Sequence, residues 1–382
     1  MSLVHGHCDP RFERLRAQFE ESFADGGEIG AGVSVYLDGE PVVDLWGGFA
    51  DAERTRPWQR DTIVSTASTT KGFTATCAHR LVDEGRLDLD APFAKYWPEF
   101  AQAGKQEIPV RWLLSHRAGL PAIRQELDAE AVLDWNRMVE CLAEESPWWE
   151  PGTKFGYHAL TFGFLVGEVI RRIAGRSVGR YLREEITGPL GVDFHIGVLE
   201  KDDGRVAEMI RIAETEETSA VMQRIMKGGD SLIGRAFGNP ALRESAIDPK
   251  RYRRAEIPAA NGHGTAEAVA RLYGALSLGG ELDGVRVLSR EAIDRATTEQ
   301  SFGEDAVLGI PMRFGLGYML RHDGLPLGPN DGTFGHLGMG GSIGFADPTA
   351  RLGFGYVMNK MQGAVAGAAR GFKLILETYA CV

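Results

Sequence analysis

The residues Ser68 and Lys71 place a hydroxyl and an amine three positions apart, a spacing that suits nucleophilic chemistry. They follow the strand-like letters IVST and open a helical pattern that we expect to run to about Glu84, with Gly85 as its stop. Residues i and i+3 share one face of a helix, so the amine would lie beside the hydroxyl. A serine needs a neighbouring base, and a lysine can be that base only when it is neutral. The pattern predicts a nucleophile. The alternative interpretation of the same residues is a helix N-terminus that Ser and Thr cap and that carries an exposed Lys without a catalytic role.

A second serine pattern, G-x-S-x-G over residues 340–344, contains Ser342. In α/β-hydrolases this pattern needs a strand before it, a helix after it, and then an acid and a histidine in chain order. The residues after Ser342 are typical of a strand and a turn, and no histidine follows His336. We therefore interpret this match as glycine-rich strand packing and not as a nucleophile.

The composition is that of an acidic globular protein. The chain has 382 residues, of which 43% are hydrophobic and 25% charged, and 53 Asp plus Glu against 42 Lys plus Arg give a formal net charge of -11. Because negative charge repels phosphate backbones and anionic lipids, neither nucleic acid nor membrane is an expected partner.

Cysteine usage and the ends of the chain give further expectations. The four cysteines, at positions 8, 77, 141 and 381, lie far apart, which disfavours a disulfide framework and a structural zinc site. His5, His7 and Cys8 are weak metal-ligand candidates because we expect this end to be a mobile tail. No cofactor is expected. The sequence shows neither a signal segment nor an apolar run of about 20 residues, so we expect a cytoplasmic protein.

Strand patterns occur at both ends of the chain, and helical patterns lie between them. Residues 31–48 are typical of two strands joined by a hairpin turn at Asp38-Gly39, the segments 314–320, 341–347 and 351–359 are also strand-like, and a helical pattern follows over 365–379. The most economical arrangement is an α+β fold in which both chain ends build one antiparallel sheet faced by the two terminal helices.

This arrangement predicts a discontinuous domain. We expect residues 1–66 and 300–382 to form the sheet domain and residues 67–299 to form a mainly helical domain. The charged stretch 200–258 is expected to be a long loop or a cap over a cleft between the two units.

Three further motifs accompany the S-x-x-K pattern. They are W-L-L-S-H-R-A-G-L over 112–120, P-G-T-K-F-G-Y-H-A over 151–159 and G-H-L-G-M-G-G-S over 335–342. Their order and spacing resemble those of serine β-lactamase-like proteins, and most of all the family VIII carboxylesterases and class C β-lactamases. The resemblance covers nearly the whole chain and implies the penicillin-recognising fold, an acyl-enzyme mechanism and no metal.

The resemblance also implies roles for particular residues. Ser68 would be the nucleophile, and Lys71 would shuttle protons together with Tyr157, which matches the tyrosine of the family's Y-x-N motif. A Tyr157 phenolate beside a protonated Lys71, or a neutral Lys71 with Tyr157 as relay, would use the same atoms, and both schemes stay open.

Other positions would shape the substrate site by the same resemblance. The backbone N–H groups of Ser68 and Met339 would form the oxyanion hole. His336 and Gly338 occupy the place of the family's K-T-G motif and would contact the substrate. The turn that carries His263 would lie near the cleft, where His263 is a weaker lining candidate.

Two positions depart from the family's pattern. Ala159 replaces the Asn of Y-x-N, and His336 replaces the Lys of K-T-G, which removes an amide and a permanent cation from the substrate side. Both changes disfavour penicillins and D-Ala-D-Ala ends but leave the acylation residues in place. We therefore expect a serine carboxylesterase that hydrolyses small-molecule, short-chain esters through an acyl-enzyme on Ser68.

Two alternatives stay open. The first is a β-lactamase, amidase or acyltransferase that uses the same nucleophile. The second is a catalytically silent β-lactamase-like binding protein, which the complete set of Ser68, Lys71 and Tyr157 argues against.

Overall fold

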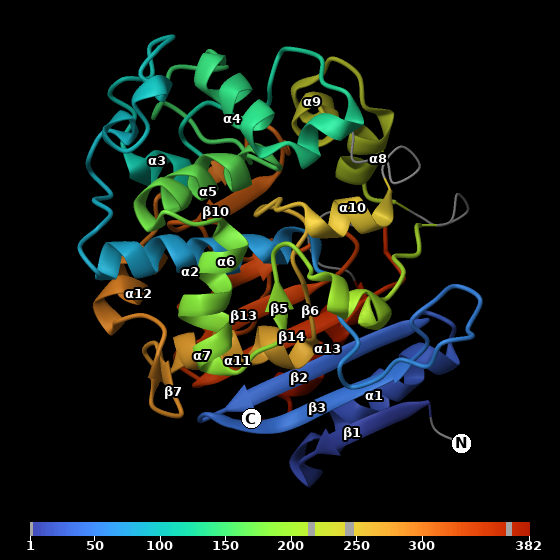
Figure 1. Cartoon of the computed structure of the whole chain (residues 1–382). Coiled ribbons are helices and arrows are strands. Elements are labelled where there is room, and N and C mark those ends of the chain that lie inside the picture. The colour runs from blue at the N-terminus through green and yellow to red at the C-terminus, as the bar shows by residue number, and fades with distance from the viewer. Residues whose placement is uncertain (1–2, 213–217, 241–247, 364–368) are drawn as a thin grey trace.

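The structure is a computed structural model that describes residues 3–212, 218–240, 248–363 and 369–382. Strands lie toward both ends of the chain and most helices lie between them (Figure 1). The strands are β1 (Val4–Cys8), β2 (Gly30–Leu37), β3 (Glu40–Gly48), β4 (Val64–Ser65), β5 (Phe194–His195), β6 (His263–Gly264), β7 (Glu281–Leu282), β8 (Val285–Arg286), β9 (Ser301–Glu304), β10 (Pro311–Phe314), β11 (Met319–Leu320), β12 (Phe334–Leu337), β13 (Ile343–Asp347) and β14 (Leu352–Met358). The α-helices are α1 (Glu13–Ala24), α2 (Thr70–Asp83), α3 (Val110–Leu114), α4 (Trp135–Glu144), α5 (Thr161–Ala174), α6 (Val178–Leu182), α7 (Gly188–Leu190), α8 (Ala220–Lys227), α9 (Leu232–Gly238), α10 (Pro249–Arg254), α11 (Ala266–Ser277), α12 (Arg290–Thr297) and α13 (Ala369–Tyr379).

One antiparallel sheet joins the two ends of the chain. Its strand order is β1-β3-β2-β14-β13-β12-β11-β10-β9, so β2 near the N-terminus lies beside β14 near the C-terminus. Their register places Val33 opposite Tyr356 and Leu37 opposite Leu352. The predicted α+β fold, with one antiparallel sheet built from both chain ends, is confirmed.

The two faces of this sheet differ in side-chain size. Ile343 and Tyr356 pair across β13 and β14, and both lie against α13. The next pair, Gly344 and Gly355, points to the opposite face because side chains alternate along a strand. There α11 lies so close that a Cβ on Gly355 would be 2.3 Å from the carbonyl oxygen of Ala266. Glycine in these strands therefore permits the backbone of a helix to rest on the sheet.

Two segments differ from their predicted form. The strand expected over 314–320 is interrupted between β10 and β11, where Gly317 has a φ of +87°. A Cβ on Gly317 would be 2.5 Å from that of Ala75 in α2, so the chain bends there to accommodate the helix. The N-terminal segment with His5 and His7, which we expected to be a mobile tail, is instead strand β1 and pairs with β3.

The middle of the chain is mostly helical, and α2 is largely buried. α2 packs against α5, α6 and α12. The stretch 200–258 contains the short helices α8, α9 and α10, while residues 213–217 and 241–247 lie outside the described residues. Of the helix predicted over 365–379, α13 covers the part from Ala369, and residues 365–368 also lie outside the description.

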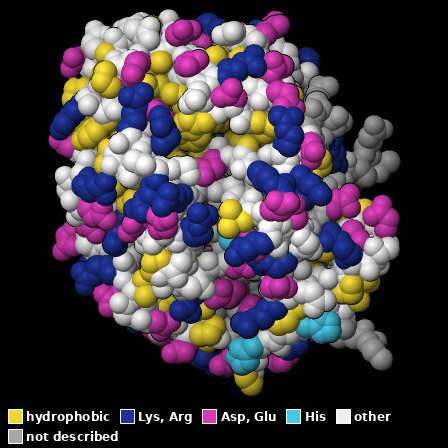
Figure 2. Space-filling model, viewed as in Figure 1, with side chains coloured by type: hydrophobic (Ala, Val, Ile, Leu, Met, Phe, Trp, Pro, Cys, Tyr) yellow, Lys and Arg dark blue, Asp and Glu magenta, His cyan; other side chains and the backbone are white. Residues whose placement is uncertain are grey.

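Charged side chains of both signs are interspersed over the face seen in Figure 2, without a broad area of one sign. Within the described ranges, no group of three or more His, Cys, Asp or Glu residues is arranged to hold a metal ion. No helix in those ranges is long and apolar enough to cross a bilayer.

Candidate active site

The turn that carries Ser68 is fixed on both sides by the segment that forms β6. The backbone N–H of Thr66 donates to the carbonyl oxygen of Gly262 at 2.8 Å, and the N–H of Gly262 donates to the hydroxyl of Thr70 at 2.8 Å. Ala67 directly before Ser68 has a φ of +43°, a left-handed conformation that is strained for a residue with a Cβ. The surrounding hydrogen bonds therefore hold Ser68 on a strained turn at the start of α2.

Lys71 lies fully buried one helical turn after Ser68. Its Nζ is 3.2 Å from Ser68 Oγ, 2.8 Å from the carbonyl oxygen of Ala159 and 2.9 Å from that of Ala259. Burial lowers the pKa of Lys71 well below its usual value and thus favours the neutral amine. A neutral amine has two N–H groups, which match the two carbonyl acceptors, and its lone pair is then left for the hydroxyl of Ser68.

The contact with Ala159 concerns a position that departs from the family's pattern. The carbonyl oxygen of Ala159 accepts a hydrogen bond from Lys71 through the backbone alone. This hydrogen bond therefore does not depend on which side chain stands at position 159.

Tyr157 is buried beside this pair, and its ring centroid lies 4.7 Å from Lys71 Nζ. Burial raises the pKa of Tyr157 above its usual value, while interaction with the Ser68 side chain acts in the opposite direction. The net direction is upward, so the phenol keeps its proton. Of the two proton-transfer schemes left open by the sequence, these surroundings favour a neutral Lys71 with Tyr157 as relay.

Two backbone donors line the cavity at Ser68. Among the described residues, neither the N–H of Ser68 nor that of Met339 donates to another group, and both residues line the same cavity. Gly338 N–H, by contrast, donates to the carbonyl oxygen of Ser342 at 2.8 Å. This arrangement leaves the two predicted oxyanion donors available to a ligand.

Ser342 and Gly338 connect the β12–β13 turn to the Ser68 turn. Ser342 is buried, and its Oγ donates to the carbonyl oxygen of Thr66 at 2.7 Å and lies 3.0 Å from Thr69 Oγ1. A Cβ on Gly338 would be 2.0 Å from Ser342 Oγ, so the close approach requires glycine. The G-x-S-x-G serine is thus a structural tie between the two turns.

His336 is buried behind the site. Its Nδ1 donates to the carbonyl oxygen of Leu337 at 2.8 Å, its Nε2 has no partner, and its ring centroid lies 6.2 Å from that of Tyr157. Burial and the nearby Lys71 lower the pKa of His336 to about 3, so the ring is neutral. Among the described residues that line the cavity, His336 and Gly338 are absent, and their contact with substrate stays a prediction.

The structure adds residues that sequence reasoning did not assign to the site. The ring of His116 lies 5.0 Å from that of Tyr157, and its Nδ1 accepts a hydrogen bond from the N–H of His158 at 3.2 Å. Asp305 Oδ1 accepts from the N–H of Tyr157 at 3.0 Å and so fixes its backbone. Both histidines stand in motifs that carried the family resemblance, whereas no sequence signal marks Asp305.

A cavity of about 900 Å³ opens beside Ser68. Apolar side chains from the segment with α8 and α9 form much of its wall. They include Met222, Ile225, Met226 and Phe237. His263, the weaker lining candidate, is also part of this wall.

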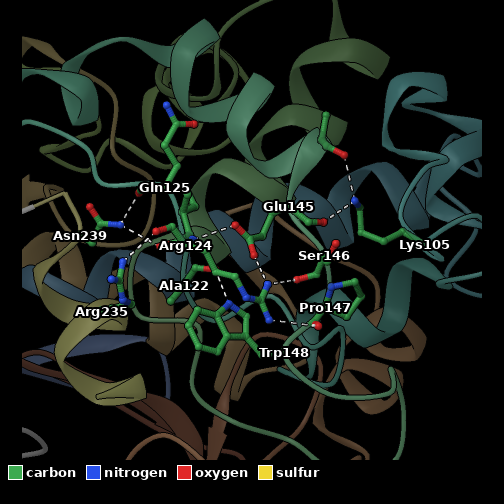
Figure 3. Close-up of polar contacts among 12 residues, drawn as sticks. Lys105, Ala122, Arg124, Gln125, Glu145, Ser146, Pro147, Trp148, Arg235 and Asn239 are labelled. Carbon is green, nitrogen blue, oxygen red and sulfur yellow. Dashed lines mark hydrogen bonds and ion pairs between the residues drawn. The ribbon is translucent and has the colours of Figure 1, made fainter. Parts of the chain in front are cut away.

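A group of polar contacts, which we call the latch, joins α9 and the following Asn239 to the segment 122–127, of which Glu126 and Leu127 line the cavity (Figure 3). Asn239 Nδ2 donates to the carbonyl oxygens of Ile123 and Gln125, both at 2.8 Å, and its Oδ1 accepts from the N–H of Leu127 at 2.9 Å. Arg235 donates to the carbonyl oxygen of Arg124 at 2.8 Å.

Arg124 itself is anchored on the side of the latch that faces away from α9. Its guanidinium pairs with Glu145 and lies 4.1 Å from the ring centroid of Trp148 (Figure 3). The indole N–H of Trp148 donates to the carbonyl oxygen of Ala122 at 2.8 Å. The segment 122–127 is thus held from both sides, which fixes the cavity wall.

Comparisons with known proteins agree with this geometry. A family model described as Beta-lactamase matches residues 15–377. The chain is 40% identical to the Esterase/beta-lactamase LipL of Mycobacterium tuberculosis over 367 residues, which cover 94% of this chain and 83% of LipL. It is 42% identical to a family VIII carboxylesterase of known structure, with a TM-score of 0.92 and coverage of 99% and 100%. EstA from Arthrobacter nitroguajacolicus Rue61a is 33% identical, with a TM-score of 0.86 and coverage of 98% and 97%.

Proposed function

The chain belongs to the beta-lactamase family, and from this premise we propose that it is a serine carboxylesterase that forms an acyl-enzyme on Ser68. The observation that carries the proposal is the position of Lys71 Nζ, 3.2 Å from Ser68 Oγ and held by two backbone carbonyls. The esterase name of LipL and the carboxylesterase name of the similar solved structure support an ester as substrate.

Acylation begins when Ser68 Oγ attacks the ester carbonyl carbon and its proton moves to the lone pair of Lys71. The negative charge that develops on the carbonyl oxygen is stabilised by the N–H groups of Ser68 and Met339, and each such donor contributes on the order of 10²–10³ in rate. Tyr157 gives its phenolic proton to the departing alkoxide and regains one from Lys71. The alcohol then leaves, and Ser68 carries the acyl group.

Deacylation uses the same groups in reverse. A water molecule donates a proton to neutral Lys71 as its oxygen attacks the acyl carbon. The Ser68 oxygen is the leaving group and regains a proton from the pair, and the carboxylic acid departs. No metal or cofactor enters either step.

Hydrolysis of β-lactams is a second candidate, favoured by the double name of LipL. It uses the same Ser68 and requires protonation of an amide nitrogen in place of an alkoxide. The neutral His336 at the K-T-G position provides no permanent cation for a lactam carboxylate, which favours esters.

Labelling and turnover test the proposal together. A fluorophosphonate probe should label Ser68 in the intact protein, and Ser68→Ala should abolish both labelling and p-nitrophenyl butyrate hydrolysis. Ser342→Ala is the matched control, and it should keep the label while losing about 1–2 kcal/mol of stability with its buried hydrogen bond. A label on Ser342, or rapid cephalosporin cleavage without ester hydrolysis, would contradict the proposal.

A further inference from the structure

His263 lies on the cavity wall next to the Ser68 turn. In β6 it pairs with Ser65 of β4, and Ser65, Ser68 and His263 all line the cavity. No hydrogen bond joins His263 to Lys71 or Tyr157 among the described residues, so it stands apart from the proton-transfer pair. Its place in the wall brings it close to a substrate bound at Ser68.

The hydrogen bonding of His263 defines its tautomer. The side chain is 2% exposed, and Nδ1 lies 2.7 Å from the carbonyl oxygen of Asn261. A carbonyl oxygen only accepts, so Nδ1 carries the proton and Nε2 keeps its lone pair. Nε2 has no partner in the described residues and, unlike the Nε2 of His336, is not sealed within the protein.

The surroundings keep this ring neutral. Burial, with a further contribution from the positive charge of Arg253, lowers the pKa of His263 to about 4. Arg253 also lines the cavity. The wall therefore offers an uncharged acceptor near the guanidinium of Arg253, which pairs with Asp203 at 3.5 Å.

The chemistry of this corner restricts the group that it binds. A substrate ammonium would donate to Nε2 but would be repelled by Arg253. A carboxylate would present lone pairs to the lone pair of Nε2. A hydroxyl donates to Nε2 without either penalty.

We propose that His263 forms a subsite that binds a hydroxyl group of the substrate, so that hydroxyl-bearing esters are preferred over their unsubstituted analogues. The inference rests on the proposed esterase function and deepens it. The hydroxyl can belong to the acyl part or to the alcohol part of the ester. The test distinguishes these two sources.

Two matched pairs of esters provide the test with the full-length protein. The acyl arm compares p-nitrophenyl 3-hydroxybutyrate with p-nitrophenyl butyrate, and the alcohol arm compares glycerol monobutyrate with propyl butyrate. For the wild type, we expect kcat/KM to be about five- to tenfold higher for the hydroxylated member of one pair, the size expected from one hydrogen bond. His263→Leu should abolish that preference, because it should lower kcat/KM for the hydroxylated ester about five- to tenfold more than for its unsubstituted analogue.

Two variants control for altered folding. His263→Gln retains a side-chain acceptor and should recover part of the preference, while His322→Leu changes a histidine that is not in the described cavity wall and should leave the preference intact. If the wild type had the same kcat/KM for both members of each pair, the proposed subsite would be refuted. It would also be refuted if His263→Leu lowered kcat/KM equally for the hydroxylated and the unsubstituted ester. Absence of hydrolysis of all four esters by the wild type would instead refute the esterase function.

Discussion

Two buried lysines of this protein have similar surroundings but different partners. Lys71 in α2 donates to the carbonyl oxygens of Ala159 and Ala259, and Lys105 donates to those of Ala143 and Glu145, at 2.9 and 2.5 Å (Figure 3). Each Nζ also lies near an aromatic ring, 4.7 Å from the centroid of Tyr157 for Lys71 and 5.0 Å from that of Phe100 for Lys105.

The difference between the two lysines lies in the third contact. Lys71 meets the hydroxyl of Ser68, whereas the negative charge of Glu145 partly opposes the effect of burial on Lys105, whose pKa is lowered to about 8. Burial thus lowers the pKa of both amines, but it lowers that of Lys105 only to about 8, so Lys105 stays mostly protonated at neutral pH. Lys71 can serve as a catalytic base because its amine contacts the hydroxyl of Ser68, whereas Lys105 has no such hydroxyl among its contacts in the described residues.

Replacing the two lysines should give the largest contrast. Lys71→Met should lower kcat for p-nitrophenyl butyrate by about 10³-fold or more, because the base is lost. Lys71→Arg should be equally poor, since a guanidinium stays protonated. Lys105→Met should keep kcat within about twofold while the melting temperature falls, because its buried carbonyls lose their donor. An active Lys71→Arg enzyme would contradict the role of a neutral amine.

Removal of the relay hydroxyl should have a smaller effect that depends on the leaving group. Tyr157→Phe should lower kcat/KM about 10²-fold for an alkyl butyrate, whose alkoxide needs a proton to leave. The loss should be several times smaller for p-nitrophenyl butyrate, because p-nitrophenolate is a stable anion. Equal losses for the two esters would show that Tyr157 acts only by packing.

The pH dependence of kcat/KM should follow Lys71. Because burial lowers its pKa, the amine loses its proton at a lower pH than an exposed lysine does, and it becomes protonated as the pH falls through the lowered pKa. The rate should therefore be level above that pKa and fall about tenfold per pH unit below it. A rate that instead rises steadily toward high pH would indicate that a Tyr157 phenolate is the base. Lys105→Met should leave the profile unchanged.

Changes in the latch should have the smallest effect on chemistry. Asn239→Ala removes three hydrogen bonds between the residue that follows α9 and the segment 123–127, and it should raise KM about threefold with little change in kcat. Asn330→Ala, which loses a hydrogen bond to Asp347 outside the described cavity wall, is the matched control. An equal effect of both variants on KM would contradict a role of the latch in substrate binding.

The sheet and the residues around Ser68 could be predicted because both depend on local patterns. Alternation and turn signals identified strands at the two chain ends, and the i, i+3 spacing brought Lys71 to Ser68. Two features of the sheet could not be predicted from local sequence patterns. Strand β1 depends on pairing with β3, and the break at Gly317 depends on contact with Ala75, so both require tertiary structure.

Other parts of the site could not be read from the sequence because backbone atoms or distant residues form them. The carbonyls of Ala159 and Ala259 have no side-chain signature, yet they orient the amine. Asp305 lies far along the chain from Tyr157, and only the fold brings them together. The helices α8 to α10 are short, so their periodicity is too brief to predict them.

The pairing of Leu37 with Leu352 in neighbouring strands has a consequence for biosynthesis. Until the ribosome has added β14, β2 has no partner on that side, and closing so long a loop is a slow step. Met339 and its oxyanion N–H are added only shortly before β14. Hydrolytic competence should therefore arise only after β14 has been synthesised, and a product terminated before that point should contain the nucleophile without a completed site.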